Sequence, residues 1–328
     1  MVSRELKIIG SMIKNSINTL SEKLASGLFK AIHWPICRAY ARRLGDKPAD
    51  GIYSFLCGLQ FWRVYRFWPD FVRPRKFSEK LWSRMLLARD PRFTLICDKL
   101  RVRDYVARKV GADFLIPLLW SGDNPDDIPF DNLPSQFVLK TNHGCGYNII
   151  VTDKKKLDPA NARCRLKKWL GENYCQDKFT GSAWGYKNIK PMVTIESFIG
   201  EKDKPPVDFK FYCFSGRAEL LTMHFDRFEG LKSIPLNRDF ERYRFGSDFK
   251  QYELEYQRPA NYDAMVQLAE ALAVGFDFIR VDLYSIGDRI YFGELTPYPV
   301  GVSKFYSFDI ATMDLMLGDK WPSSDYPA

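Results

Sequence analysis

The first 30 residues carry a regular alternation of apolar and basic positions. Eight apolar side chains recur every three or four residues, with lysines between them (Ile8, Ile9, Met12, Ile13, Ile17, Leu20, Leu24 and Leu28). This period places the apolar side chains on one side of a helix. Up to Lys47 the chain has nine basic and three acidic residues, an excess of six positive charges. The pattern predicts a basic amphipathic helix over residues 5–30, which lies either on an anionic inner-membrane surface or against the rest of the chain.

From about Asp98 onward, short apolar runs alternate with longer helical periods. Four apolar runs predict strands (residues 137–140, 192–199, 208–214 and 218–225). Residues 260–276 predict an amphipathic helix, and residues 278–285 and 289–295 predict a hairpin that turns at Gly287. This mixture of strands and helices indicates an α+β fold.

Composition narrows the class of protein. A hydrophobic content of 46% allows a large core and excludes a wholly disordered chain, while the net charge of +9 favours anionic partners. The seven cysteines contain no C-x-x-C pair and the three histidines lie far apart, so neither a zinc ribbon nor a histidine metal site is indicated. No apolar run is long enough to span a membrane and the first residues make a poor signal peptide, so we expect a cytoplasmic protein.

Residues 61–77 interleave aromatic side chains with four arginines and a lysine. Such a stretch is compatible with base stacking, with binding of an acidic glycan, or with aromatic core residues beside surface arginines. Because the chain has no RNA-binding motif, we expect no nucleic-acid partner.

A lysine and two glycines form the first candidate for chemistry. Lys140 ends a predicted strand, and the segment His143-Gly144-Cys145-Gly146 follows it. Two glycines allow the backbone to turn sharply and to aim N–H groups at an anion, and a lysine adds a point charge for a phosphate oxygen. The spacing matches neither a P-loop nor a dinucleotide fingerprint, so it predicts only an anion-binding loop or a hairpin turn.

Two carboxylates on the predicted hairpin form the second candidate. Arg280 and Asp282 lie on one strand, and Glu294 and Thr296 lie on its partner. Residues two apart on a strand face the same side, and antiparallel pairing can bring Glu294 beside Asp282. Burying two carboxylates and an arginine in an apolar hairpin is costly unless another charge compensates. The pattern predicts either magnesium that bridges nucleotide phosphates or a structural salt bridge.

The order of these segments resembles the ATP-grasp fold. A lysine strand with a glycine loop is followed by a strand with Glu196, a strand with Asp208 and Lys210, a helix, and the hairpin. The segments CDKLRVRDYV, FVLKTNHGCGYNIIV, DFKFYCFSG, RVDLY and IYFGELT are similar to those of the TupA-like (teichuronopeptide-biosynthesis-like) branch. This resemblance covers roughly residues 75–310. It implies two α+β lobes that clasp ATP, a small lobe with the glycine loop (96–191) and a large lobe with the metal site (192–328), after a helical, basic region (1–95).

The resemblance also implies which residues bind the nucleotide. Lys140 matches the phosphate-binding lysine, and Lys99 falls near a second lysine that contacts the nucleotide. The loop from His143 through Gly144 and Cys145 to Gly146 matches the segment that covers the triphosphate.

The remaining nucleotide-binding positions follow the glycine loop in the chain. Glu196 matches the hinge acid beside the adenine, with Ile199 in the same hinge segment. Asp208 falls near the ribose-binding carboxylate.

The same resemblance implies magnesium ligands and catalytic residues. Asp282 and Glu294 match the metal ligands, while Thr296 stands where the family usually has asparagine as a third ligand. Arg280 matches the arginine that stabilises the transferring phosphoryl group, and Lys210 is assigned beside it as a second catalytic residue. ATP and Mg²⁺ are the implied cofactors.

The implied reaction joins a carboxylate to an amine through an acyl phosphate, with formation of ADP. For this branch we expect an amino acid to be joined to a uronic-acid carboxylate of a capsular or cell-wall polysaccharide. An ATP-grasp kinase that phosphorylates a glycan hydroxyl is the main alternative, because the same residues would serve. A glycosyltransferase is disfavoured because the chain has no D-x-D motif, and a non-catalytic binding module is disfavoured by the intact set of charged residues.

Overall fold

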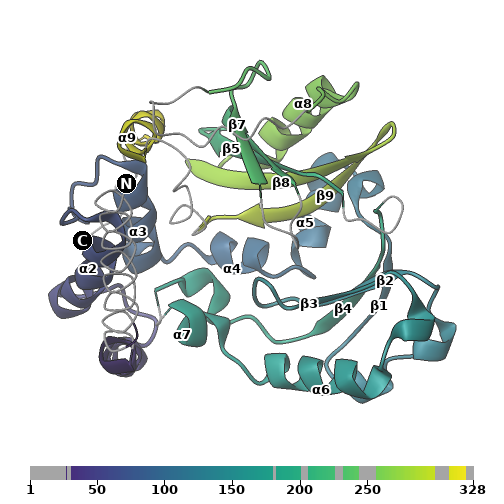
Figure 1. The fold of residues 1–328 in the computed structure, drawn as a ribbon. Helices are drawn as coiled ribbons and strands as arrows, with labels where there is room; N and C mark the ends of the chain where they lie inside the picture. The colour runs from purple at the N-terminus through teal and green to yellow at the C-terminus, as the bar shows by residue number, and fades with distance from the viewer. Residues whose placement is uncertain are drawn as a thin grey trace, which may run out of the picture.

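The protein folds around two antiparallel β-sheets with helices on their outer sides, in a computed structural model (Figure 1). The described residues are 27, 31–179, 182–200, 206–225, 232–243, 256–299 and 310–322. The α+β class expected from the sequence is confirmed. Apart from Gly27, the helix predicted over residues 5–30 lies outside the described residues, and its membrane contact stays a prediction.

The smaller sheet has the strand order β1-β4-β2-β3. Its strands are β1 (Leu118–Gly122), β2 (Phe137–Thr141), β3 (Asn148–Val151) and β4 (Val193–Ser197). Helix α6 (Pro159–Leu170) packs beneath the sheet through Ala162 and Leu166, which are buried with Phe137 and Leu139. The strand predicted over residues 137–140 is present as β2, and its side chains alternate between buried and half-buried, so one face lies on a core.

The larger sheet has the order β7-β6-β5-β8-β9. Its strands are β5 (Asp208–Phe214), β6 (Arg217–Phe225), β7 (Lys232–Leu236), β8 (Phe278–Ile286) and β9 (Arg289–Thr296). All seven residues of the central strand β5 are buried. Phe209, Phe211 and Cys213 share a core cluster with helix α8 (Tyr262–Ala273), whereas Tyr212 and Phe214 face a second aromatic cluster. Because side chains alternate along a strand, Asp208 and Lys210 lie on the side of the sheet opposite to α8.

Helices make up the N-terminal region and connect the sheets. Residues 31–44 are helical, and further α-helices follow (α2, Gly51–Tyr65; α3, Phe77–Leu87; α4, Pro91–Cys97; α5, Val102–Val110; α7, Tyr174–Phe179; α9, Ile310–Lys320). Short 3-10 helices lie between them (η1, Ala112–Phe114; η2, Pro125–Asp127; η3, Phe130–Asn132; η4, Lys154–Lys156; η5, Trp184–Tyr186). No helix among the described residues is long and apolar enough to cross a membrane.

A buried arginine joins the helical region to the larger sheet. Arg84 of α3 has a fully buried side chain and forms an ion pair with Asp277 at 2.5 Å. Its guanidinium also donates to the carbonyl oxygens of Phe278, at the start of β8, and of Pro297, just after β9. Trp321 lies over the guanidinium at 4.3 Å. Arg84 therefore holds the outer ends of the two hairpin strands that carry the predicted metal ligands.

Candidate active site

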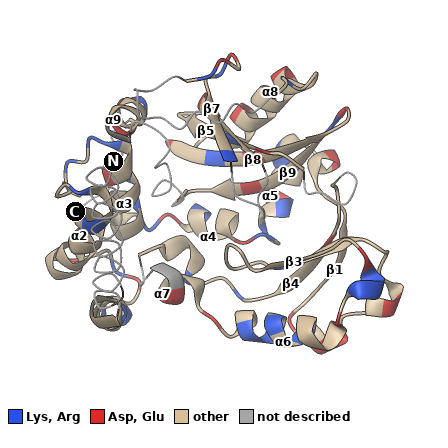
Figure 2. Ribbon diagram, viewed as in Figure 1, with Lys and Arg blue, Asp and Glu red and all other residues tan. Residues whose placement is uncertain are grey.

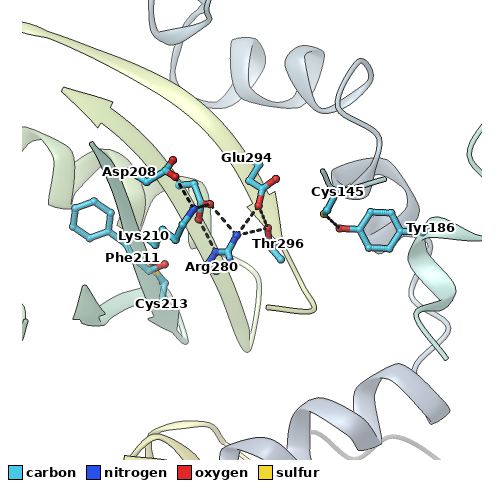
Figure 3. Close-up of polar contacts among 10 residues, drawn as sticks. Cys145, Tyr186, Asp208, Lys210, Phe211, Cys213, Arg280, Glu294 and Thr296 are labelled. Atoms are coloured by element: carbon cyan, nitrogen blue, oxygen red, sulfur yellow. Dashed lines mark hydrogen bonds and ion pairs between the residues drawn. The ribbon is translucent and has the colours of Figure 1, made fainter. Parts of the chain in front are cut away.

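A row of charged side chains crosses the inner face of the larger sheet. Lys210 of β5 lies opposite Asp282 of β8, and Asp282 lies opposite Glu294 of β9. In the neighbouring row, Arg280 lies opposite Thr296. Figure 3 shows Lys210, Arg280, Glu294 and Thr296 turned toward one another across the three strands. The structure thus brings together the residues that the sequence predicted for metal binding and catalysis.

Asp282 is the centre of this cluster. Arg280 donates to both of its carboxylate oxygens, at 2.6 and 2.8 Å, and Lys210 also donates to Asp282. Arg280 reaches Glu294 at 2.5 Å, and the Thr296 hydroxyl donates to the same Glu294 oxygen at 2.8 Å. The salt bridge that was one of the two sequence hypotheses therefore exists in the structure.

A β-bulge places Glu294 on the same side as Asp282. From the turn, pairing runs in register as far as Leu283 opposite Phe292, and it then shifts so that Asp282 pairs with Glu294. Without the shift Asp282 would pair with Gly293, and Glu294 would point to the opposite face. A Cβ at Gly293 would lie 3.0 Å from the Asp282 carbonyl oxygen. Glycine therefore permits the close approach that the bulge requires.

Burial and the neighbouring charges shift the pKa values of this cluster in different directions. Burial alone would raise the pKa of Glu294, but the positive charges of Arg280, Lys99 and Lys210 hold that pKa well below its ordinary value. Burial disfavours the charged form of Arg280, yet Asp282 and Glu294 raise the pKa of Arg280 further above its ordinary value. Burial raises the pKa of Asp282, and Arg280 and Lys210 oppose that rise.

The carboxylates are suited to magnesium that is shared with a nucleotide. In the part of the chain that the structure describes, no group of three or more His, Cys, Asp or Glu side chains surrounds one metal position. Mg²⁺, however, is commonly bound by one or two carboxylates together with substrate phosphates. Asp282 and Glu294 supply two carboxylates, and the second oxygen of Glu294 has no hydrogen bond to any described residue. The donor set therefore fits a nucleotide-bound magnesium ion.

The glycine loop lies opposite this cluster and is held by polar contacts. Lys99 donates to the Gly144 carbonyl oxygen, and Asn142 donates to Asp98 at 2.9 Å. Because Lys99 also lowers the pKa of Glu294, its charge acts on both the loop and the carboxylate. Cys145 is exposed and lies 3.5 Å from the Tyr186 hydroxyl, across from Glu294 and Thr296 (Figure 3).

His143 has a different environment from the rest of the loop. Its side chain is 2% exposed, its Nε2 lies 3.0 Å from the Trp169 carbonyl oxygen, and burial lowers its pKa. In this structure the His143 side chain contacts its own protein and holds the loop in place. Its predicted contact with nucleotide stays a prediction.

The two glycines of the loop are required for different reasons. A Cβ at Gly144 would lie 2.7 Å from the Tyr174 ring and 2.8 Å from the Tyr147 ring. Gly146 has open space around it but a φ of +78°, which favours glycine.

Gly144→Ala is expected to lower the melting temperature, with a loss of about 1–3 kcal/mol from overpacking, and to weaken nucleotide binding. The Tyr147 ring cannot retreat freely, because it stacks on Trp169 at 5.4 Å. Gly171→Ala is the matched control, since its Cβ would make only ordinary contacts, 3.5 Å or longer. Calorimetric melting and nucleotide titration check both variants. Equal melting temperatures and equal nucleotide affinities of the two variants would show that the loop does not require glycine at position 144.

Lys140 and Glu196 form a second charged group on the smaller sheet. Lys140 of β2 pairs with Glu196 of β4 at 2.6 Å, and Arg103 of α5 pairs with the other Glu196 oxygen at 2.9 Å. Ile199 lies half-buried just past β4. The structure thus brings Lys140 and Glu196 into contact, although the resemblance assigned them to different parts of a nucleotide.

Three residues of the site were not identified from the sequence. Arg103 holds Glu196, while Tyr212 lies opposite Arg280 and His224 opposite Asp208 in the sheet register. A signal for two of them was present, because Tyr212 lies two residues after Lys210 on β5 and His224 pairs with the same strand. Arg103 lies far from Glu196 in sequence and gave no such signal.

Comparison with known proteins identifies the family. A model of the TupA-like ATPgrasp family matches residues 79–321. The chain therefore belongs to the TupA-like ATP-grasp family, and the ATP-grasp fold expected from its motifs is confirmed. A search of curated proteins found no match.

Solved structures of ATP-grasp and related ligases are similar to this chain at low sequence identity. ATP-grasp ligase PsnB complexed with its minimal precursor is 13% identical, with a TM-score of 0.40 over 70% of this chain and 61% of PsnB. D-alanine-D-alanine ligase from Helicobacter pylori is 18% identical, with a TM-score of 0.37 over 70% and 62% of the two chains. Macrocyclase MdnC bound with precursor peptide MdnA from Microcystis aeruginosa is 13% identical, with a TM-score of 0.39 over 73% and 64%. The chain spans about three fifths of the length of these proteins.

Proposed function

We propose that this protein is an ATP-dependent carboxylate–amine ligase that requires magnesium. The observation that supports this most strongly is the row formed by Lys210, Asp282 and Glu294, with Arg280 beside it, on a strand-lined face opposite the glycine loop. Such a row combines cations for phosphoryl oxygens with carboxylates for a metal ion. Phosphoryl transfer needs positioning and charge neutralisation more than a nucleophilic side chain.

In the proposed reaction, the chain's own residues position the triphosphate and neutralise its charge. Lys140 and Lys99 bind phosphate oxygens, and the loop 143–146 covers them. Glu196, Ile199 and Asp208 hold the adenine and ribose. Mg²⁺ held by Asp282 and Glu294, with Thr296 as a weaker third ligand, would neutralise the phosphates.

Two bond exchanges complete the proposed reaction. A carboxylate oxygen of the acceptor attacks the γ-phosphorus, the bond to the bridging oxygen breaks, and ADP leaves. An amine then attacks the acyl carbon, inorganic phosphate leaves, and the amine loses a proton to give the amide. Arg280 and Lys210 stabilise the charge on the phosphoryl group and then on the oxyanion of the second step.

We further propose that the carboxylate belongs to a uronic acid of a bacterial capsular or cell-wall polysaccharide, and that the amine is an amino acid. The net charge of +9 favours such an acidic glycan. The reaction would take place in the cytoplasm, with peripheral contact at the inner face of the membrane through residues 5–30.

Product analysis tests the proposed function. The protein is incubated with ATP and magnesium across a panel of uronic-acid glycans and amino acids, and ADP release is followed together with the product mass. Gain of one amino acid minus water is the expected result. Gain of phosphate on the glycan would select the kinase instead, and ADP release with neither product would exclude both.

A further inference from the structure

The N-terminal helices carry an apolar surface that the core does not use. Eleven large hydrophobic side chains are exposed among the described residues, and seven of them lie between Ile32 and Val72. On α2 the exposed residues Ile52, Phe55 and Trp62 are spaced three and seven residues apart, which places them on one side of the helix. The opposite side of α2 carries Tyr53, Cys57 and Phe61, which are buried. Helix α2 thus has two apolar sides, of which only one is covered.

Trp68 extends this surface. The chain turns back after α2, and the Trp68 ring lies 5.6 Å from the Phe55 ring and against Gly58. Exposed fractions are 60% for Ile52, 55% for Phe55, 47% for Trp62 and 52% for Trp68. We call these four residues the α2 apolar face. Contiguous exposed apolar residues of this kind mark interaction sites more often than isolated ones do.

The region that carries the α2 apolar face is rich in positive charge, and Arg66 lies beside Trp62, 5.9 Å from its ring. Residues 31–76 contain nine basic and three acidic residues, a net charge of 9 − 3 = +6. The three acids are engaged: Asp46 with Lys187, Asp50 with the start of α2, and Asp70 with the backbone of the following turn. Three arginines, in contrast, form no ion pair with any described acidic side chain (Arg66, Arg73 and Arg75). Figure 2 shows basic residues in the helical region around α2 and α3.

The types of residue on the α2 apolar face indicate which kind of partner it binds. An acidic glycan would use the aromatic rings and arginines, but it gains nothing from an exposed isoleucine. Ile52 is 60% exposed. Aliphatic side chains, tryptophans and arginines on one surface are typical of proteins that lie in the interface of an anionic membrane.

We infer that the α2 apolar face docks on an anionic lipid surface. Ile52, Phe55, Trp62 and Trp68 enter the boundary between headgroups and acyl chains, while Arg66, Arg73 and Arg75 contact lipid phosphates. This contact is distinct from the one predicted for residues 5–30, and it does not depend on the proposed ligase activity.

Vesicle binding of the full-length chain tests this inference. Co-sedimentation with vesicles of phosphatidylglycerol and phosphatidylcholine is compared with vesicles of phosphatidylcholine alone. We expect binding to the anionic vesicles that weakens as salt increases. The double variant Ile52→Ser/Trp62→Ser should reduce partitioning by about 10-fold or more, because two exposed apolar side chains no longer leave water. Residues 1–30 remain intact in every variant.

The matched control removes two exposed apolar side chains elsewhere, as Val274→Ser/Leu315→Ser, and should bind vesicles like the parent. Arg66→Gln/Arg73→Gln/Arg75→Gln should lose binding to anionic vesicles, and melting temperatures verify that all variants fold. Equal binding of the α2 double variant and the parent would overturn the inference, as would absence of parental binding or equal loss in the control. Retention of an acidic polysaccharide without vesicle binding, or self-association that the α2 variant abolishes, would assign the face to those partners instead.

Discussion

Glu294→Gln is expected to lower turnover by about 100-fold or more while changing the stability of the folded chain little, because replacing even an outer partner of a metal site costs about 10–100-fold. Glutamine retains an oxygen that accepts from Thr296 and Arg280, as Glu294 does. Arg280 also keeps its two bonds to Asp282, so no buried cation is left unpaired. The lost group is the carboxylate charge that a magnesium ion would need.

Asp282→Asn is the variant to compare with Glu294→Gln, because its expected effect on stability is different. Asp282 is 2% exposed and is shared by Arg280 and Lys210, so its neutralisation leaves two buried cations short of a partner. A loss of about 3–5 kcal/mol in the free energy of unfolding is expected. Steady-state kinetics and denaturant unfolding of both variants separate the two roles. If the folded Glu294→Gln variant turned over as fast as the parent, Glu294 would serve only in the salt bridge and not in metal binding.

The sequence predicted the strands of the site because their side chains alternate or are continuously apolar. The β8–β9 hairpin was predicted from two apolar runs joined at Gly287, and this pairing is confirmed. The facing of Asp282 and Glu294 was predicted from simple alternation, but it depends on the bulge at Gly293. An in-register hairpin with this turn would separate the two carboxylates onto opposite faces. Two features of the sequence indicate the bulge. Counting residues back from the turn places Asp282 opposite Gly293 and not opposite Glu294, and a glycine lies directly beside Glu294.

Long-range contacts were beyond the sequence pattern. Nothing in the local pattern of α3 shows that Arg84 reaches the carbonyl oxygens at the ends of β8 and β9, 194 and 213 residues away. The aromatic stretch 61–77 was left open between core and surface. The structure divides it, since Phe61, Phe71 and Phe77 are buried while Trp62 and Trp68 are exposed. Phe61 and Trp62 differ because neighbouring residues of α2 lie on different sides of the helix, one against the core and one exposed.

Lys140→Met is expected to weaken nucleotide binding by about 10- to 150-fold, the equivalent of one charge-assisted hydrogen bond of about 1.5–3 kcal/mol. The Lys140 side chain is 24% exposed, so its ammonium group remains accessible beside Glu196. The fold should persist, because Glu196 keeps its ion pair with Arg103 at 2.9 Å. Methionine retains most of the apolar stem that packs on the sheet.

The control exploits the two cations that share Glu196. Arg103→Met removes the other ion pair of Glu196, and with it the bond to the Ile116 carbonyl oxygen, but leaves Lys140 in place. If Lys140 binds phosphate, isothermal titration with a non-hydrolysable ATP analogue should show a much larger loss of affinity for Lys140→Met than for Arg103→Met. If Lys140 serves only to neutralise Glu196, the two variants should lose affinity equally. A phosphate contact further requires that the loss for Lys140→Met be smaller with adenosine than with the triphosphate, because adenosine has no phosphate for the lysine to bind.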